Sequence, residues 1–279
     1  MSAPRRRLAA LLLAPGTAFL VLAFCSIVAL LVSYSTRTEQ TSTLFAPFDL
    51  GTWRVALSDG YLWSVVGVTM RLGLTVSLLT VLIAYPLAWC VHTMRRPWQA
   101  AAVLFVVFSP ILVSVVVRSY GWAMLLRPGG VFGDAFDGWL YHEPGVVVAL
   151  VHVELPFALF AILASVRSVP ADLAPAAADL GAGPVRRFTK VLLPLTLPGV
   201  LSGAQLVFAL TISAFATPAL LGGGRVTVLA QTIYQNIQQL AWPLAAVQAV
   251  VLLALTLVVL TAFTLLTRLA SGRSRAVAR

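Results

Sequence analysis

The chain has 279 residues, of which 60% are hydrophobic and only 10% are charged, and its formal net charge is +10. Its mean hydropathy is +0.95, whereas soluble domains average roughly 45–50% apolar and 25% charged residues. A soluble fold cannot bury so large an apolar surface, so the sequence predicts a protein whose solvent is lipid. The basic residues are not interleaved with exposed aromatic residues on one domain, which argues against nucleic-acid binding.

Six stretches are long enough to cross a bilayer, because a membrane helix needs about 20 predominantly apolar residues. A polar, moderately aromatic segment follows the first stretch, and a Gly-rich segment follows the third. The sequence therefore predicts an all-α, polytopic membrane bundle with six transmembrane helices. We place these helices at residues 10–33, 62–91, 100–119, 145–166, 195–217 and 243–267.

The basic residues are distributed unevenly between the two sides of this predicted bundle. If both termini lie inside the cell, 13 of the 19 Lys and Arg residues fall on the cytoplasmic side. Cytoplasmic loops of membrane proteins carry an excess of Lys and Arg. We therefore expect a multi-pass protein of the cell (inner) membrane with both termini in the cytoplasm, together with the loop at residues 170–198.

That loop is the longest internal segment with substantial polar content, and its sequence predicts two short helices. Asp172 is a suitable N-cap for the first helix, with Pro175 in an early turn. Gly181 suits the left-handed position that ends this helix, and Gly183-Pro184 suits a turn. The second predicted helix is basic and runs into an apolar end, with Arg186, Arg187, Lys190, Leu192, Leu193 and Pro194. A polar pair of helices between two spans indicates a docking site for another protein.

The fourth span carries two polar residues, His152 and Glu154, and Glu154 lies near its middle. A carboxylate at that depth costs about 2.5–3.5 kcal/mol on insertion scales, so it normally faces a cavity and has a function. The alternative is a protonated carboxyl group that is hydrogen-bonded within the bundle. His152 is two residues away and points to another side of the helix, so it is not the expected partner of Glu154.

Enzymatic chemistry is not predicted. The single lysine, Lys190, follows Thr189 and lies outside any Gly-x-x-x-x-Gly-Lys phosphate loop. The three histidines have no second metal ligand at a useful spacing. Cys25 and Cys90 lie in separate apolar stretches and predict neither a disulfide framework nor a metal site. We expect no cofactor and no catalytic residues.

The polar loop resembles the cytoplasmic coupling loop of binding-protein-dependent ABC importer permeases. Its signature is Glu-Ala-Ala, three residues, Gly, nine residues and an Ile-x-Leu-Pro ending. Pro175 stands where the family usually has Glu, and Val191 replaces Ile. The positions that match are Ala176, Ala177, Gly181, Leu193 and Pro194.

Shorter motifs extend this resemblance over roughly residues 60–270. Residues 85–88 read Tyr-Pro-Leu-Ala, and residues 118–122 read Arg-Ser-Tyr-Gly-Trp, similar to the family's "YPLA" and "RxYxW" elements. Residues 217–223 (Thr-Pro-Ala-Leu-Leu-Gly-Gly), 233–235 (Ile-Tyr-Gln) and 242–243 (Trp-Pro) resemble the spermidine/putrescine branch.

The resemblance implies a type I ABC importer permease, which is a transport subunit and not an enzyme. It implies three domains: residues 1–60, with the N-terminal tail, the first span and the outer segment; a core permease domain at 61–270, with five spans and the coupling loop at 170–194; and a basic tail at 271–279. Its implied partners are a cytoplasmic ATP-binding subunit dimer, which hydrolyses the ATP, a second permease subunit in a heterodimer, an extracytoplasmic solute-binding protein and the lipid bilayer.

The implied site residues form two groups. The ATPase-coupling group is Asp172, Pro175, Ala176, Ala177, Gly181, Ala182, Arg186, Val191, Leu193 and Pro194. Glu154, Thr211 and Ser213 are candidates for the substrate path. The expected solute is a polyamine; the alternatives are the same importer class with a different small solute, or an ion-coupled secondary carrier.

Overall fold

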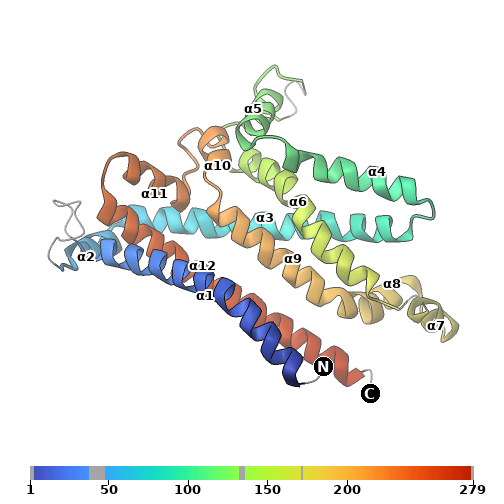
Figure 1. Ribbon diagram of the computed structural model, residues 1–279. Coiled ribbons are helices and arrows are strands. Elements are labelled where there is room, and N and C mark those ends of the chain that lie inside the picture. Colours follow the sequence, from blue (N-terminus) through green and yellow to red (C-terminus); the bar gives the residue numbers. More distant parts are fainter. Residues whose placement is uncertain (1–2, 38–47, 132–135, 171, 278–279) are drawn as a thin grey trace. The chain divides into compact units, whose positions relative to one another are not determined.

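The computed structural model describes residues 3–37, 48–131, 136–170 and 172–277, with side chains between residues 14 and 268 of these ranges. Within them the regular elements are helices, apart from one isolated bridge between Arg37 and Phe48 (Figure 1). Five helices are long and apolar enough to cross a membrane, and one bent pair passes the same test together. The prediction of an all-α membrane bundle is confirmed, with six crossings when the bent pair is counted as one.

The chain divides into two compact units, and the first contains residues 1–62 and 232–253. Its elements are α1 (Ala3–Ser35), α2 (Gly51–Ser58), most of α11 (Leu229–Gln238) and the beginning of α12 (Trp242–Val277). The indole Nε1 of Trp53 donates to Ser35 Oγ at 3.3 Å, and the hydroxyl of Thr52 donates to the Arg37 carbonyl at 3.1 Å. These bonds attach α2 to the end of α1.

The second unit contains residues 63–231 and 254–279 and holds both groups of predicted site residues. Most of its first half consists of α3 (Gly60–Thr93), α4 (Pro97–Phe108), α5 (Val115–Leu126) and α6 (Glu143–Arg167). The second half continues with α7 (Leu173–Asp179), α8 (Pro184–Arg187), α9 (Leu193–Ser213) and α10 (Ala216–Leu221). Prolines in the first turn help to start α4 and α6, where the missing amide is not needed.

Helices α6 and α9 form the most closely packed pair of the second unit (Figure 1). A Cβ atom placed on Gly203 would lie 3.4 Å from the Ala158 carbonyl oxygen, and one placed on Gly199 would overlap the Ser165 side chain. These contacts show that the two helices run antiparallel. Small residues allow this approach, which matters because lipid supplies no hydrophobic force between helices.

The predicted third span at residues 100–119 is wrong as one straight helix. Helix α4 tightens into the 3₁₀ turn η1 (Ser109–Leu112), and after Val113 and Ser114 the chain resumes as α5, bent by 105°. Pro110 lies in the turn and both linking residues are extended, so the α-helical hydrogen bonding is interrupted here. The Arg118 guanidinium of α5 donates to the Pro110 carbonyl oxygen and stabilises the bend.

The predicted fifth span at residues 195–217 ends too late in the sequence. Helix α9 stops at Ser213, and Ala216 begins the separate helix α10. Ala214, between them, is extended, with φ −70° and ψ 126°. The Thr217 hydroxyl of α10 lies 3.1 Å from the Ser119 hydroxyl of α5, so α10 is bonded to the bent span rather than continuing α9.

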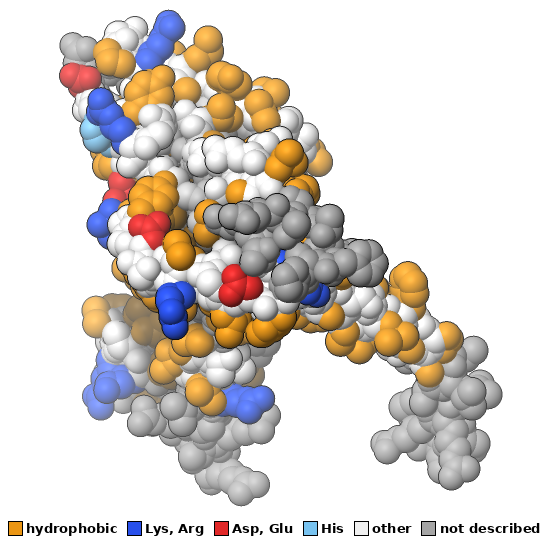
Figure 2. All heavy atoms as spheres, turned by 90° about the vertical axis from the view of Figure 1, so that its left-hand side faces the viewer, with side chains coloured by type: hydrophobic (Ala, Val, Ile, Leu, Met, Phe, Trp, Pro, Cys, Tyr) orange, Lys and Arg blue, Asp and Glu red, His pale blue; other side chains and the backbone are white. Residues whose placement is uncertain are grey.

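Apolar side chains are exposed over much of the surface visible in Figure 2. Several belong to the long helices, among them Leu78 on α3, Phe105 on α4 and Phe160 on α6. An exposed apolar surface of this extent is stable in lipid and not in water. It agrees with the span assignment.

Candidate functional site

The predicted docking loop contains helix α7, and its beginning differs from the prediction. Asp172 precedes the helix, but its side chain makes no capping hydrogen bond. Its backbone has φ −81° and ψ −17°, whereas a capping side chain needs the extended region to reach the amides of the first turn. The Asp172 carbonyl accepts the Ala176 amide at 2.9 Å. The predicted side-chain cap is therefore wrong.

The end of α7 is formed as the sequence predicts. Gly181 has φ +79°, which is the left-handed region that favours glycine. The Gly181 amide donates to the Ala178 carbonyl at 2.8 Å, and the Ala182 amide donates to the Ala177 carbonyl at 3.0 Å. This pair of bonds is a Schellman motif, which satisfies the last carbonyl groups of the helix. The end of the exposed helix therefore has a defined geometry.

The second predicted helix does not end at Pro194 but continues into the membrane. Helix α8 passes through the π-helical turn η2 (Phe188–Leu192) directly into α9. The Leu193 amide donates to the Phe188 carbonyl, five residues back. Pro194 has no amide hydrogen, and its ring would clash with the carbonyl four residues before it, so a wider turn at this place accommodates the proline. Residues 184–213 thus form one 30-residue helix.

The "YPLA" tyrosine of α3 packs against this π-helical turn. Its ring makes a T-shaped contact with Phe188, with 5.6 Å between the centroids. The Tyr85 hydroxyl lies 3.0 Å from Thr196 Oγ1 at the start of α9. Pro86 lies within a continuous α3. Tyr85 therefore links α3 to the segment that leads out of the docking loop.

Leu180 and Val185 are the most exposed large apolar side chains of the docking loop, and the sequence prediction did not name them. Leu180 is 89% exposed and Val185 is 75% exposed. They lie on either side of the turn formed by Gly181 and Gly183. Arg186 is also exposed, whereas Val191 and Leu193 are half-buried. The signal in the sequence was the presence of large apolar residues beside the Gly-rich turn of this loop.

The three substrate-path candidates lie in different environments. Glu154 is 5% exposed, and Thr211 is 3% exposed. Ser213 is exposed, and its hydroxyl donates to the Leu210 carbonyl at 2.9 Å. The contact between Gly203 and Ala158 in this antiparallel pair places Thr211 about one helical turn beyond Glu154. Ser213 does not share their buried position.

Glu154 is the one acidic residue inside the six predicted spans. Its Oε2 atom, like Thr211 Oγ1, is buried and has no hydrogen-bond partner among the described residues. Arg118 of α5 lies near enough to interact electrostatically with the Glu154 carboxylate. His152 instead accepts a hydrogen bond from the Trp122 indole at 3.2 Å, so it is not the partner of Glu154.

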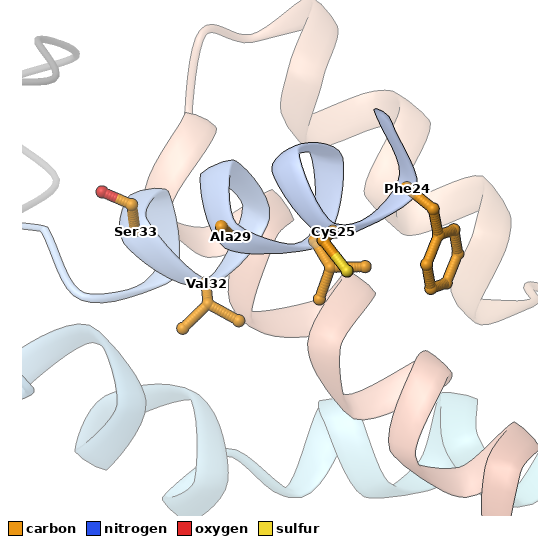
Figure 3. Close-up of a pocket in the computed structure, with 6 residues that line it drawn as sticks. Phe24, Cys25, Ala29, Val32 and Ser33 are labelled. Carbon is orange, nitrogen blue, oxygen red and sulfur yellow. The ribbon is translucent and has the colours of Figure 1, made fainter. Parts of the chain in front are cut away.

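The first unit contains a shallow apolar pocket of about 560 Å³ that is lined by α1 alone (Figure 3). Phe24, Cys25 and Val32 line it, and neither Cys25 nor Cys90 forms a disulfide. The described side chains include no group of three or more His, Cys, Asp or Glu that could hold a metal ion. The pocket therefore offers an apolar surface to lipid or to another apolar helix.

Comparisons with known proteins give a family and a fold. The model of the family "Binding-protein-dependent transport system inner membrane component" matches residues 73–273. The inner membrane ABC transporter permease protein YdcU of Escherichia coli is 28% identical over 76% of this chain and 74% of its own length. The spermidine/putrescine transport system permease protein PotB of the same organism is 26% identical over 70% of this chain and 74% of its own length.

Among solved structures, the chain is similar to a component of a bacterial alginate ABC transporter, crystallised with an alginate pentasaccharide-bound periplasmic protein. The TM-score is 0.70 at 18% sequence identity, and the match covers 95% of each chain. At that identity the likeness concerns the fold alone. Because the family model covers most of the chain, the protein belongs to the binding-protein-dependent inner membrane components, the permease subunits of ABC importers.

Proposed function

We propose that residues 170–198 are the coupling loop through which this permease receives the action of a separate, cytoplasmic ATP-binding subunit dimer. The observation that carries the proposal is the pair of strongly exposed apolar side chains, Leu180 and Val185, on either side of the turn in this loop. Apolar side chains that are exposed together outside the lipid often mark a protein interface. The surrounding residues Asp172, Pro175, Ala176, Ala177, Gly181, Ala182 and Arg186 form the rest of the docking surface.

The helix that leaves this loop gives the proposal a mechanical route. Residues 184–213 are one helix, so a displacement of α8 is carried into α9 through Val191, Leu193 and Pro194. Helix α9 packs along α6, which carries Glu154. The π-helical turn and the Tyr85–Phe188 contact lie where this helix leaves the loop. ATP-driven movement at the loop would thereby change the packing around the solute path.

Replacing both exposed apolar residues tests the docking role. We expect the variant carrying Leu180→Asp and Val185→Asp to insert normally but to lose co-purification with the ATP-binding subunit. Val131→Asp is the matched control, because Val131 is 79% exposed in the loop that follows α5. Undiminished co-purification of the double variant, at equal expression, would contradict the docking role.

We also propose that both termini and the coupling loop face the cytoplasm, with the core permease domain at residues 61–270 between the flanking segments. The uneven distribution of Lys and Arg supports this orientation. Single cysteines at Thr36, Ala182 and Ser271, in a background without Cys25 and Cys90, test it. An impermeant thiol reagent should label only the Thr36 position in intact cells. Labelling of Ala182→Cys from outside would reverse the orientation.

For the solute, we propose a polyamine of the spermidine/putrescine class, delivered by an extracytoplasmic binding protein to a heterodimer of this chain and a second permease. The motifs at residues 217–223 and 233–235 and the similarity to PotB support this choice. A single carboxylate at mid-span, Glu154, is chemically suited to attract a cationic solute. Thr211, and at the end of α9 Ser213, would add hydroxyl groups to the same path. Another small solute of the same importer class is the alternative.

Glu154→Gln in the complete, reconstituted transporter tests this assignment, because it keeps the shape of the side chain and removes its charge. We expect the uptake of spermidine to fall while basal ATP hydrolysis is kept, and Glu154→Asp to retain more uptake than Glu154→Gln. Equal uptake by the Gln variant and the parent would leave Glu154 a structural residue. A ligand screen on the cognate binding protein tests the solute class independently of Glu154.

A further inference from the structure

A cleft of about 810 Å³ lies at the base of the coupling loop, between α3 and the beginning of the helix formed by α8 and α9. This volume falls in the range of roughly 300–1,000 Å³ that is typical of small-molecule sites. Its walls are largely apolar and aromatic, with Leu82, Tyr85, Trp89, Phe188, Leu192 and Val200 among them. An apolar cleft of this size is suited to a hydrocarbon chain rather than to a nucleotide or a polar metabolite.

Arg187 is the one charged residue among those that line the cleft. Its side chain is half-buried, and its Nε atom is buried without a hydrogen-bond partner among the described residues. A buried donor without an acceptor is costly, and more so when it is charged. The described part of the chain contains one salt bridge, between Arg71 and Glu143, so no acidic side chain there neutralises Arg187. The guanidinium is available to an anion from outside the chain.

We propose that this cleft binds an anionic phospholipid of the cytoplasmic leaflet, with an acyl chain along the apolar walls and the phosphate group on Arg187. The proposal rests on the proposed orientation, which places the coupling loop on the cytoplasmic side. Basic pockets between membrane helices on that side are suited to anionic head groups. Arginine suits this role because its planar fork of donors matches phosphate oxygens. The neighbouring Arg186 and Lys190 are exposed and increase the positive charge around the entrance.

The position of the lipid gives it a role in coupling. Tyr85 of α3 and Phe188 of the π-helical turn both line the cleft, and their rings are in contact with each other. Ala174 of α7 also lines the cleft. A bound acyl chain would therefore contact α3, the coupling helix and the start of α9 at once, and would stiffen the link between them.

Lipid retention by the complete transporter tests this site without requiring ATP hydrolysis. The complex is equilibrated in vesicles of phosphatidylglycerol and phosphatidylcholine, extracted in detergent, and its retained lipids are measured by mass spectrometry. We expect selective retention of phosphatidylglycerol, and about tenfold weaker retention by Arg187→Gln, since a charge-assisted hydrogen bond is lost. Arg95→Gln is the matched control, because Arg95 is exposed and does not line the cleft. It should retain the lipid as the parent does.

A second variant separates the apolar walls from the charge. Leu82→Trp fills the cleft from α3 and leaves Arg187 in place, and we expect it to retain less phosphatidylglycerol while the complex stays monodisperse. Retention that is equal in the parent, Arg187→Gln and Leu82→Trp would overturn the proposal. So would cross-linking of Leu82→Cys to the second permease subunit in the complete complex, because a protein would then occupy the cleft. Neither result would bear on the proposed docking of the ATP-binding subunit or on the proposed orientation, which are tested separately.

Discussion

The second unit places two contrasting regions next to each other in the sequence. Along α6 and α9, the side chains of Ile162, Val166 and Phe208 are fully buried, and two glycines allow the helices to approach closely. Between these helices, the coupling loop has large apolar side chains, Leu180 and Val185, that no part of the described chain covers. Both regions are rich in apolar residues. They differ in whether other parts of the same chain cover those residues.

The contrast separates the residues that pack the helices of this chain against each other from those that, in our proposal, contact the ATP-binding subunit. In lipid, helix association depends on close packing and on hydrogen bonds, so a change at the α6–α9 contact should act on stability. Outside lipid, an ordered apolar surface gains from being covered, so a change in the coupling loop should act on assembly and coupling. Substitutions of glycine test the distinction directly, because one glycine of each region is required for a different physical reason.

The largest effect is expected for Gly181→Val. No atom lies within 4 Å of a Cβ placed there, so the cost comes from the backbone, whose φ is +79°. A left-handed conformation costs a β-branched residue about 1–2 kcal/mol, which lowers the population of the native loop roughly five- to thirtyfold. ATP-driven uptake should fall by a similar factor in reconstituted vesicles, while the thermal stability of the bundle is kept.

Gly183→Val is the matched control for this variant. Gly183 lies two residues away, has equally open surroundings, and has φ −64° and ψ 166°, a conformation that valine adopts readily. Its uptake should remain close to that of the parent. Parental uptake by Gly181→Val as well would mean that the geometry of the Schellman motif is not needed for coupling.

An energetic cost of similar size, seen in thermal stability and not in uptake, is expected for Gly199→Ala in the packed α6–α9 contact. The added methyl group would overlap the Ser165 Cβ atom, which has no flexible end that can move away. The helices must then separate, and overpacking of this kind typically costs about 1–3 kcal/mol. The apparent melting temperature of the detergent-solubilised complex should fall, while the fraction bound to the ATP-binding subunit is kept.

Gly203→Ala serves as the control on the same face of α9, one turn along. A Cβ atom there would be 3.4 Å from its nearest neighbour, which is an ordinary contact. Its melting temperature should be close to that of the parent. An equal fall in melting temperature for both variants would contradict this prediction, because the close approach at Gly199 would then not determine the stability of the α6–α9 contact.

The sequence predicted the helical membrane fold because apolar composition and span length are properties of the chain alone. It also predicted the conformation of Gly181, since a left-handed helix end leaves a local signature. It did not predict the bend after Pro110, the continuity of the helix past Pro194 or the uncapped Asp172. Each of these depends on how a proline or an acidic residue is accommodated by its surroundings, and a helix can respond with a break or with a wider turn.

Prediction of the candidate site had a similar limit. The mid-span position of Glu154 was evident from the sequence, but its buried position opposite α9 follows from the register of two helices. The exposure of Leu180 and Val185 also depends on tertiary packing, because the sequence does not show which parts of the chain cover a loop residue. The coupling motif identified a segment, and the structure distinguished its exposed side chains from those that connect it to the bundle.

The smallest effect is expected for Pro175→Glu in the coupling helix. Pro175 is the third residue of α7 and is exposed, and a proline is tolerated there because the first turn leaves its amides without helical partners. A glutamate at this position would interact favourably with the helix dipole, by about 0.3–1 kcal/mol, and its side chain could reach back to the amide before the helix. Uptake in reconstituted vesicles should stay within about fivefold of the parent, which corresponds to an energy of at most about 1 kcal/mol. Pro175→Gln is the control that removes the proline without adding charge, so a difference between the two variants measures the charge alone. A tenfold loss of uptake in both variants would show that the proline ring itself contacts the ATP-binding subunit, and the exposed surface would then extend from Leu180 back to the start of α7.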